Sequence, residues 1–146
     1  MKRPLLAISM GDPAGIGPEV VVKAASVPDV YEEVRLVVFG DVEVLARAAR
    51  EMASSVSVIG YPSAAEAAKV SLRPGELAAV GPSEISGGGF DWACPTPASD
   101  RAQVEYIRSA YEAVAAGAAS GMVTAPVNKA SIRRVGVDFP GHTELL

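Results

Sequence analysis

Short apolar runs alternate with helical patterns along this chain, and this alternation constrains the fold more than any other feature. Residues 5–10 form an apolar run interrupted only by Ser9, which is typical of a strand buried on both faces, and residues 34–39 predict a second buried strand. Shorter runs at residues 56–59, 77–80 and 122–124 predict further strands. We therefore expect an α/β fold with a largely parallel sheet flanked by helices.

Helical patterns fill most of the intervals between these runs. Pro18 suits the first turn of a helix that runs to about residue 25. Asp41 predicts the N-cap of a helix with an apolar stripe formed by Val42, Leu45, Ala49 and Met52. Ser99 and Asp100 predict the cap of a long helix with a stripe formed by Val104, Ile107, Tyr111, Val114 and Ala118.

The remaining parts of the chain are an irregular stretch and a last helix. Residues 60–98 are rich in Pro, Gly and Ser, and they indicate either an excursion to an edge hairpin or a crossover between subdomains, with Gly87-Gly88-Gly89 as a flexible turn. A last helix is predicted from about Lys129 to Val135, where Gly136 stops it. We expect a first α/β region over residues 1–120 and the start of a second over residues 121–146.

Composition limits the class of protein. With 146 residues and 49% hydrophobic side chains, the chain can bury the core of one domain and is not disordered. A net charge of −4 with interspersed signs argues against a nucleic-acid partner. No apolar run approaches the roughly 20 residues that cross a bilayer, so we expect no membrane partner.

The scarcity of Cys and His limits redox and metal chemistry. Cys94 is the single cysteine, which rules out an internal disulfide and indicates a reducing compartment. One His and one Cys cannot supply a His/Cys zinc site, because such a site takes three or four protein ligands. If a metal is used, we expect its ligands outside this chain.

The first candidate loop follows the first predicted strand, Gly11-Asp12-Pro13-Ala14-Gly15-Ile16-Gly17-Pro18-Glu19. Glycines before a helix present backbone N–H groups to an anion. The spacing is neither the dinucleotide fingerprint nor a P-loop. A tight turn with Glu19 beside the helix N-terminus is the alternative interpretation.

Two later stretches carry further candidates. Asn128 can cap the helix that begins at Lys129, and the Lys129 ammonium would then hold a phosphate or carboxylate; the alternative is a solvated lysine beside a structural cap. His142 can donate a hydrogen bond and Thr143 can bind a second substrate oxygen, unless His142 is an ordinary surface residue or Thr143 caps a helix starting at Glu144. We expect the glycine turn and the His142–Thr143 pair to converge on one cleft.

Together these stretches resemble the 4-hydroxythreonine-4-phosphate dehydrogenase family of pyridoxal-phosphate biosynthesis. The resemblance lies in the glycine turn from Met10 to Glu19, in Val123-Thr124-Ala125-Pro126-Val127-Asn128-Lys129 and in Pro140-Gly141-His142-Thr143-Glu144. Residues 81–98 follow the family pattern loosely, and some relatives carry His in place of Asn128. The Gly15–Glu19 part is also similar to the opening of isocitrate and isopropylmalate dehydrogenases, which share this fold.

The resemblance implies a cytoplasmic homodimer that uses NAD or NADP and a divalent metal such as Zn, Mg, Mn or Co. It implies oxidation of the C3 hydroxyl of 4-phosphooxy-L-threonine, followed by decarboxylation. It also implies that His142 and Thr143 bind substrate. Asn128 and Lys129 are our own candidates for contacts to substrate or cofactor anions, and Asp12 is expected to be structural.

Family members are about twice as long, and their metal-binding histidines follow the position of Thr143. We therefore expect this sequence to be a fragment or truncated form, inactive alone, with strands 5–10 and 34–39 lacking neighbours. Alternatives are a paralogue acting on D-threonate or D-erythronate 4-phosphate, a phosphate acetyltransferase-like enzyme, and a non-catalytic ligand-binding module.

Overall fold

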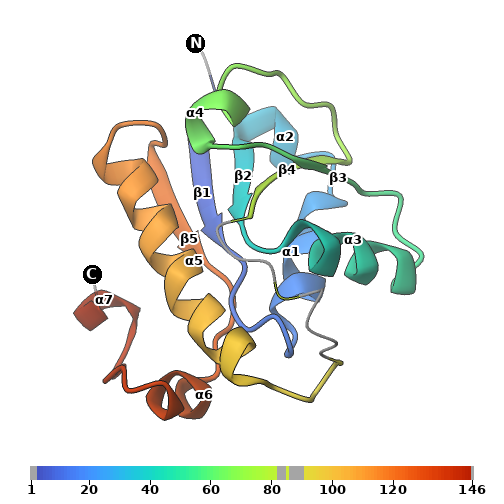
Figure 1. Ribbon diagram of the computed structural model, residues 1–146. Helices are drawn as coiled ribbons and strands as arrows, with labels where there is room; N and C mark the ends of the chain where they lie inside the picture. Colours follow the sequence, from blue (N-terminus) through green and yellow to red (C-terminus); the bar gives the residue numbers. More distant parts are fainter. Residues whose placement is uncertain (1–2, 82–84, 86–90, 146) are drawn as a thin grey trace.

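The computed structural model describes residues 3–81, 85 and 91–145. Within these residues the strands form one parallel sheet in the order β3-β4-β2-β1-β5 (Figure 1). The α/β fold with a parallel sheet is thus confirmed. The strands are β1 (Leu5–Ser9), β2 (Arg35–Phe39), β3 (Ser57–Gly60), β4 (Glu76–Val80) and β5 (Gly121–Thr124).

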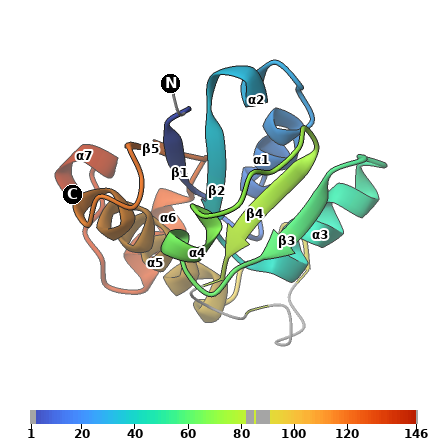
Figure 2. The same cartoon turned by 90° about the horizontal axis from the view of Figure 1, so that it is seen from above.

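Helices cover both faces of the sheet. Figure 2 shows α1 and α3 on one side and α4 and α5 on the other. No helix of the described residues is long and apolar enough to span a bilayer. The helices are α1 (Gly17–Ala25), α2 (Val30–Glu33), α3 (Val42–Glu51), α4 (Ala64–Ala67), α5 (Pro97–Ala115), α6 (Lys129–Arg134) and α7 (His142–Leu145).

The expectation that the first two strands would lack neighbours is wrong. β1 lies between β2 and β5, and β2 lies between β1 and β4. The irregular stretch supplies β4, which enters the sheet between β2 and β3 rather than forming an edge hairpin. Central strands therefore have fully buried side chains, such as Ala7, Val37 and Leu77. The Gly87-Gly88-Gly89 turn lies outside the described residues.

The predicted cap of α3 is confirmed. The Asp41 Oδ1 atom accepts hydrogen bonds from the backbone N–H groups of Glu43 and Val44, at 3.0 and 3.1 Å. Its Oδ2 atom accepts a 2.8 Å bond from the Ile85 N–H, 44 residues further along the chain. The stripe is displaced from the predicted one: Met52 is 38% exposed, whereas Val44, Leu45, Ala48 and Ala49 are buried.

The predicted cap of α5 is wrong. Thr96 is the N-cap, and its hydroxyl and that of Ser99 each accept a bond from the other's backbone N–H. Pro97 then occupies the first turn, so the helix starts earlier than predicted. The buried face also differs, because Tyr111 is 45% exposed and the fully buried Tyr106 takes the inward position.

A second, smaller apolar cluster holds the C-terminal segment against α5. It consists of Val104, Ile107, Ile132 and Phe139. β5 belongs to the main sheet, whereas α6 and α7 follow it along α5 (Figure 1). The division of the chain near residue 120 stays a prediction.

Candidate functional site

The glycine turn after β1 packs directly against the loop after β5. The Asp12 N–H donates a 2.9 Å hydrogen bond to the Pro126 carbonyl oxygen. Gly11 has φ +77°, and a Cβ atom there would lie 2.2 Å from the same oxygen. Because β1 and β5 are parallel neighbours, both loops lie at the carboxyl ends of adjacent strands, where α/β sheets bind ligands.

Asp12 shapes this turn from inside. Its side chain is buried, with 7% of the residue exposed, and its Oδ1 atom accepts a 2.9 Å bond from the Ala14 N–H. Burial raises the pKa of the Asp12 carboxyl, and the nearby Asp100 charge adds to the rise, while the Ala14 N–H and Arg134 oppose it. This geometry is consistent with the predicted structural role.

The two loops form an open pocket of about 600 Å³. Gly15 and Ile16, which lead into α1, line the pocket, and α1 begins without a side-chain cap for its first backbone N–H groups. Ile16 is 59% exposed at its rim. The lining residues are Asp12, Gly15, Ile16, Pro126, Val127, Asn128, Lys129 and Ala130.

Asn128 caps α6 as predicted, with its Oδ1 atom accepting a 3.1 Å bond from the Ser131 N–H. The Asn128 N–H in turn donates a 2.8 Å bond to the Oε1 atom of Gln103, which is fully buried in α5. Sequence reasoning missed Gln103, because a glutamine within a helical pattern is ordinarily a surface residue. The Gln103 side chain thereby holds the backbone of Asn128, which lines the pocket.

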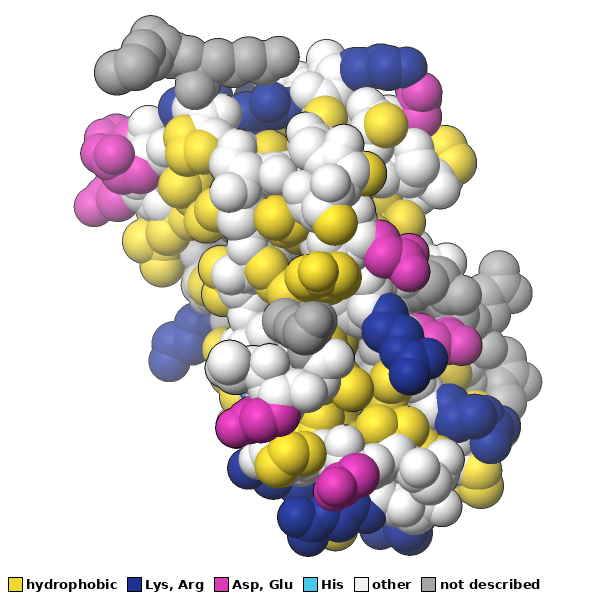
Figure 3. Space-filling view, turned by 90° about the vertical axis from the view of Figure 1, so that its left-hand side faces the viewer, with side chains coloured by type: hydrophobic (Ala, Val, Ile, Leu, Met, Phe, Trp, Pro, Cys, Tyr) yellow, Lys and Arg dark blue, Asp and Glu magenta, His cyan; other side chains and the backbone are white. Residues whose placement is uncertain are grey.

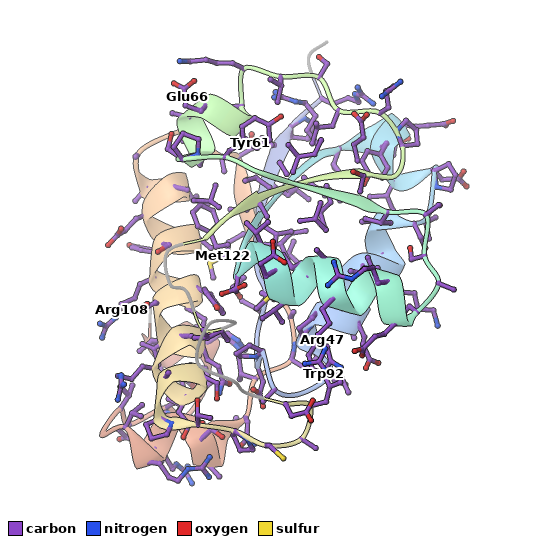
Figure 4. All side chains as sticks on the ribbon, turned by 45° about the vertical axis from the view of Figure 1, so that its right-hand side comes forward. Arg47, Tyr61, Glu66, Trp92, Arg108 and Met122 are labelled. Carbon is purple, nitrogen blue, oxygen red and sulfur yellow. The ribbon has the colours of Figure 1, made fainter. Side chains whose placement is uncertain are left out.

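A second support comes from the turn between Asp91 and Cys94. The Ala93 N–H donates a 2.8 Å bond to the Ala14 carbonyl, so this turn lies against the glycine turn. Figure 4 shows Arg47 of α3 beside Trp92, and the guanidinium carbon lies 4.7 Å from the ring centroid. Arg47 also pairs with Asp91 at 2.9 Å, which fastens the turn to α3.

Lys129 and His142 lie close together at the C-terminal end of the site. The Lys129 Nζ atom donates a 2.8 Å bond to the Pro140 carbonyl. The His142 ring meets Phe139 edge-on, with centroids 5.1 Å apart. Burial lowers the pKa of His142, and the positive charge of Lys129 lowers it further, so both effects favour the neutral imidazole.

The pocket beside the glycine turn does not extend to the predicted His142–Thr143 pair. The pocket joins the glycine turn to residues 126–130, but its lining includes neither His142 nor Thr143. The reason is that buried Phe139 anchors the intervening segment beneath α5. Figure 1 shows α7 to the left of α5, away from α1, into which the glycine turn leads. Lys129 links the pocket to the segment before His142, since it lines the pocket and donates a hydrogen bond to the Pro140 carbonyl.

A family model described as pyridoxal phosphate biosynthetic protein PdxA matches residues 32–146. The chain belongs to the PdxA family. Sequence relatives agree with this assignment. The chain is 39% identical over 144 residues to the 4-hydroxythreonine-4-phosphate dehydrogenase of Desulfosudis oleivorans, covering 99% of this chain and 41% of that protein. It is 36% identical over 156 residues to the D-threonate 4-phosphate dehydrogenase of Bordetella bronchiseptica, covering 98% and 40%.

Solved structures of the PdxA family show the same architecture. The crystal structure of a 4-hydroxythreonine-4-phosphate dehydrogenase from Burkholderia phymatum matches with a TM-score of 0.90 at 29% identity. That match covers 100% of this chain and 43% of the crystallised chain. This PdxA chain therefore spans about two fifths of the length of the relatives that it matches.

The described part of this PdxA chain contains no group of three or more His, Cys, Asp or Glu side chains that could hold a metal ion. These residues therefore do not form a site for the divalent ion that the resemblance implies. They do fit an anionic group, because Lys129 borders the same pocket as Gly15 and Ile16, which lead into the uncapped helix α1.

Proposed function

We propose that this chain is part of an NAD- or NADP-dependent dehydrogenase. Its substrate would be 4-phosphooxy-L-threonine, which is oxidised and then decarboxylated in the biosynthesis of pyridoxal 5'-phosphate. One observation carries the proposal: in a PdxA chain, the glycine turn and the Asn128–Lys129 loop meet in one pocket at the carboxyl ends of β1 and β5. A phosphorylated substrate is also what the names of the relatives specify.

The proposed roles follow from charge and donor geometry. Lys129 offers an ammonium with three N–H donors, one of which the Pro140 carbonyl uses, so two remain for an anion. His142 offers a ring N–H that can donate a hydrogen bond to substrate, and exposed Thr143 supplies a hydroxyl beside it. NAD or NADP, when bound, would supply the acceptor for the hydride lost from C3 as its hydroxyl group gives up a proton and becomes a ketone.

The broader assembly is also part of the proposal. We infer a homodimer in the cytoplasm, with ligands for the divalent metal supplied from beyond residue 146. Exposed Cys94, the single cysteine of the sequence, is consistent with a reducing compartment. Because metal ligands are lacking among the described residues, we expect the chain alone to bind substrate but not to turn it over.

A paralogous substrate is the second candidate. The 36% identical relative from Bordetella bronchiseptica is named for D-threonate 4-phosphate, so this compound or D-erythronate 4-phosphate could occupy the same loops. Each of these substrates has a phosphate ester and hydroxyl groups, for which the pocket offers the same donors. Comparing the affinities of the three compounds decides between them.

Calorimetric titration of the 146-residue chain with each compound tests the proposal. We expect one phosphate ester to bind, and His142→Ala to weaken it by about tenfold or more, as for loss of a hydrogen bond to a charged group. Arg108→Ala is the matched control, since Arg108 points outward from α5 in Figure 4. The proposal fails if no compound binds, or if His142→Ala and Arg108→Ala behave alike.

A further inference from the structure

The exposed Lys129 makes a contact that an ordinary solvated lysine does not need. Its ammonium reaches from the first residue of α6 to the Pro140 carbonyl, at 2.8 Å, and spans the segment between α6 and α7. The same segment is anchored on its other side by Phe139, which is fully buried. Pro140 is therefore held between a buried ring and a cation.

His142 follows this fixed point by two residues. Its Nε2 atom is buried and has no hydrogen-bond partner within the described part of the chain. An unpaired imidazole nitrogen beneath the surface costs free energy unless a ligand or water satisfies it. The ring is held edge-on against Phe139, so the orientation of this nitrogen is set by the same loop that Lys129 binds.

We propose that Lys129 is a positioning residue that clasps the Pro140 carbonyl and thereby fixes the His142 imidazole for the incoming substrate. This inference rests on the proposed function, because it assumes that His142 binds substrate. It assigns Lys129 a role additional to the direct anion contact suggested by its sequence. The bond to Pro140 uses one of the three N–H donors of the ammonium, so two donors remain for an anion.

The electrostatic surroundings agree with this role. Lys129 is the charged group that acts on the imidazole from α6, and its cation favours the neutral ring. From α7 itself, the Glu144 side chain folds back toward Gly141. A Cβ atom built on Gly141 would lie 2.5 Å from the Glu144 Oε2 atom. Figure 3 views the molecule from the left-hand side of Figure 1. It shows Lys and Arg side chains gathered at the lower end of that face, at the level of α6 in Figure 1.

The chain offers a direct test, because His142 is its single histidine and gives one set of imidazole NMR signals. We would titrate that signal in ligand-free protein and measure backbone order parameters for residues 141–143. Lys129→Met removes the ammonium and keeps most of the stem. Lys129→Arg keeps a cationic donor, and Arg133→Met removes a cation from an exposed position of the same helix.

We expect Lys129→Met to raise the titration midpoint of His142 and to lower the order parameters below about 0.6. Lys129→Arg should restore both, and Arg133→Met should change neither. The inference is overturned if Lys129→Met leaves both readouts unchanged, or if Arg133→Met shifts them equally. Neither readout involves substrate, so a failure here is distinct from a failure of the binding titration above.

Discussion

Asp12 is a carboxyl group enclosed by the turn that it helps to form. Its Oδ1 atom bonds the Ala14 N–H, and Gly15 leaves room for its other oxygen, since a Cβ there would lie 3.0 Å from Oδ2. An enclosed carboxylate loses hydration that one backbone hydrogen bond does not replace. Burial therefore raises its pKa above the ordinary 3.8.

This pKa gives a pH-dependent prediction for Asp12→Asn. The native state holds the Asp12 proton to a higher pH than the unfolded chain does. The contribution of Asp12 to the free energy of unfolding therefore falls as pH rises from the ordinary pKa through the native one. Asparagine keeps an acceptor for Ala14 but does not ionise, so its advantage over aspartate should grow as pH rises above about 4, the ordinary pKa of the carboxyl. Urea unfolding measures this trend, and an advantage that shrinks with pH would contradict it.

Gly11 supplies a sharper test, because its position forbids a side chain for two reasons. Its φ is +77°, and its Cβ would lie 2.2 Å from the Pro126 carbonyl oxygen. Gly117 has φ +75° but nothing within 4 Å, so it isolates the conformational cost. We expect Gly117→Ala to cost about 1 kcal/mol and Gly11→Ala about 3 kcal/mol or more. Equal losses in denaturant unfolding would show that the two loops do not touch.

At the scale of elements, an ion pair joins α5 to α6. The Arg134 guanidinium binds both carboxylate oxygens of Asp100, at 3.1 and 3.2 Å, and the Ser131 hydroxyl at 2.7 Å. Asp100 is 3% exposed, so it has little access to water in place of this partner. This pair fixes α6 beside the pocket wall that Asn128 begins.

Removing the arginine should therefore loosen α6. We expect Arg134→Met to lower the free energy of unfolding by about 1 to 3 kcal/mol, because it leaves a buried carboxylate without its partner. Arg133→Met on the same helix serves as the control and should cost less than about 0.5 kcal/mol, as an exposed substitution does. Chemical denaturation measures both, and the interpretation is wrong if the two variants lose equal stability.

The whole molecule has two packing centres of unequal size. The larger one surrounds the sheet, whereas the smaller one holds the C-terminal segment through Val104, Ile107, Ile132 and Phe139. A segment fastened by so few side chains can open while the sheet stays folded. The Lys129 clasp and the Asp100–Arg134 pair reinforce this smaller centre.

Phe139→Ala tests this division. Loss of a fully buried phenylalanine costs about 3 to 5 kcal/mol, and we expect the loss to appear as local opening of residues 127–145. Native-state hydrogen exchange should then accelerate in α6 while β1 and β2 keep their protection. Val38→Ala in β2 should instead lower protection throughout. Uniform acceleration in the Phe139→Ala variant would show that the chain has one cooperative unit.

Local patterns in the sequence determined several features by themselves. Apolar stretches predicted all five strand positions in the described residues, and Asp41 and Asn128 predicted their helix caps. Both signals are local, because a strand pattern and a helix cap each involve residues that are close in the sequence. The position of β4 and the inward face of α5 required the tertiary structure, since strand order and helix rotation depend on distant partners. The same holds for Gln103 behind Asn128 and for Lys129 on Pro140. These contacts join residues 25 and 11 positions apart, and no local periodicity encodes them.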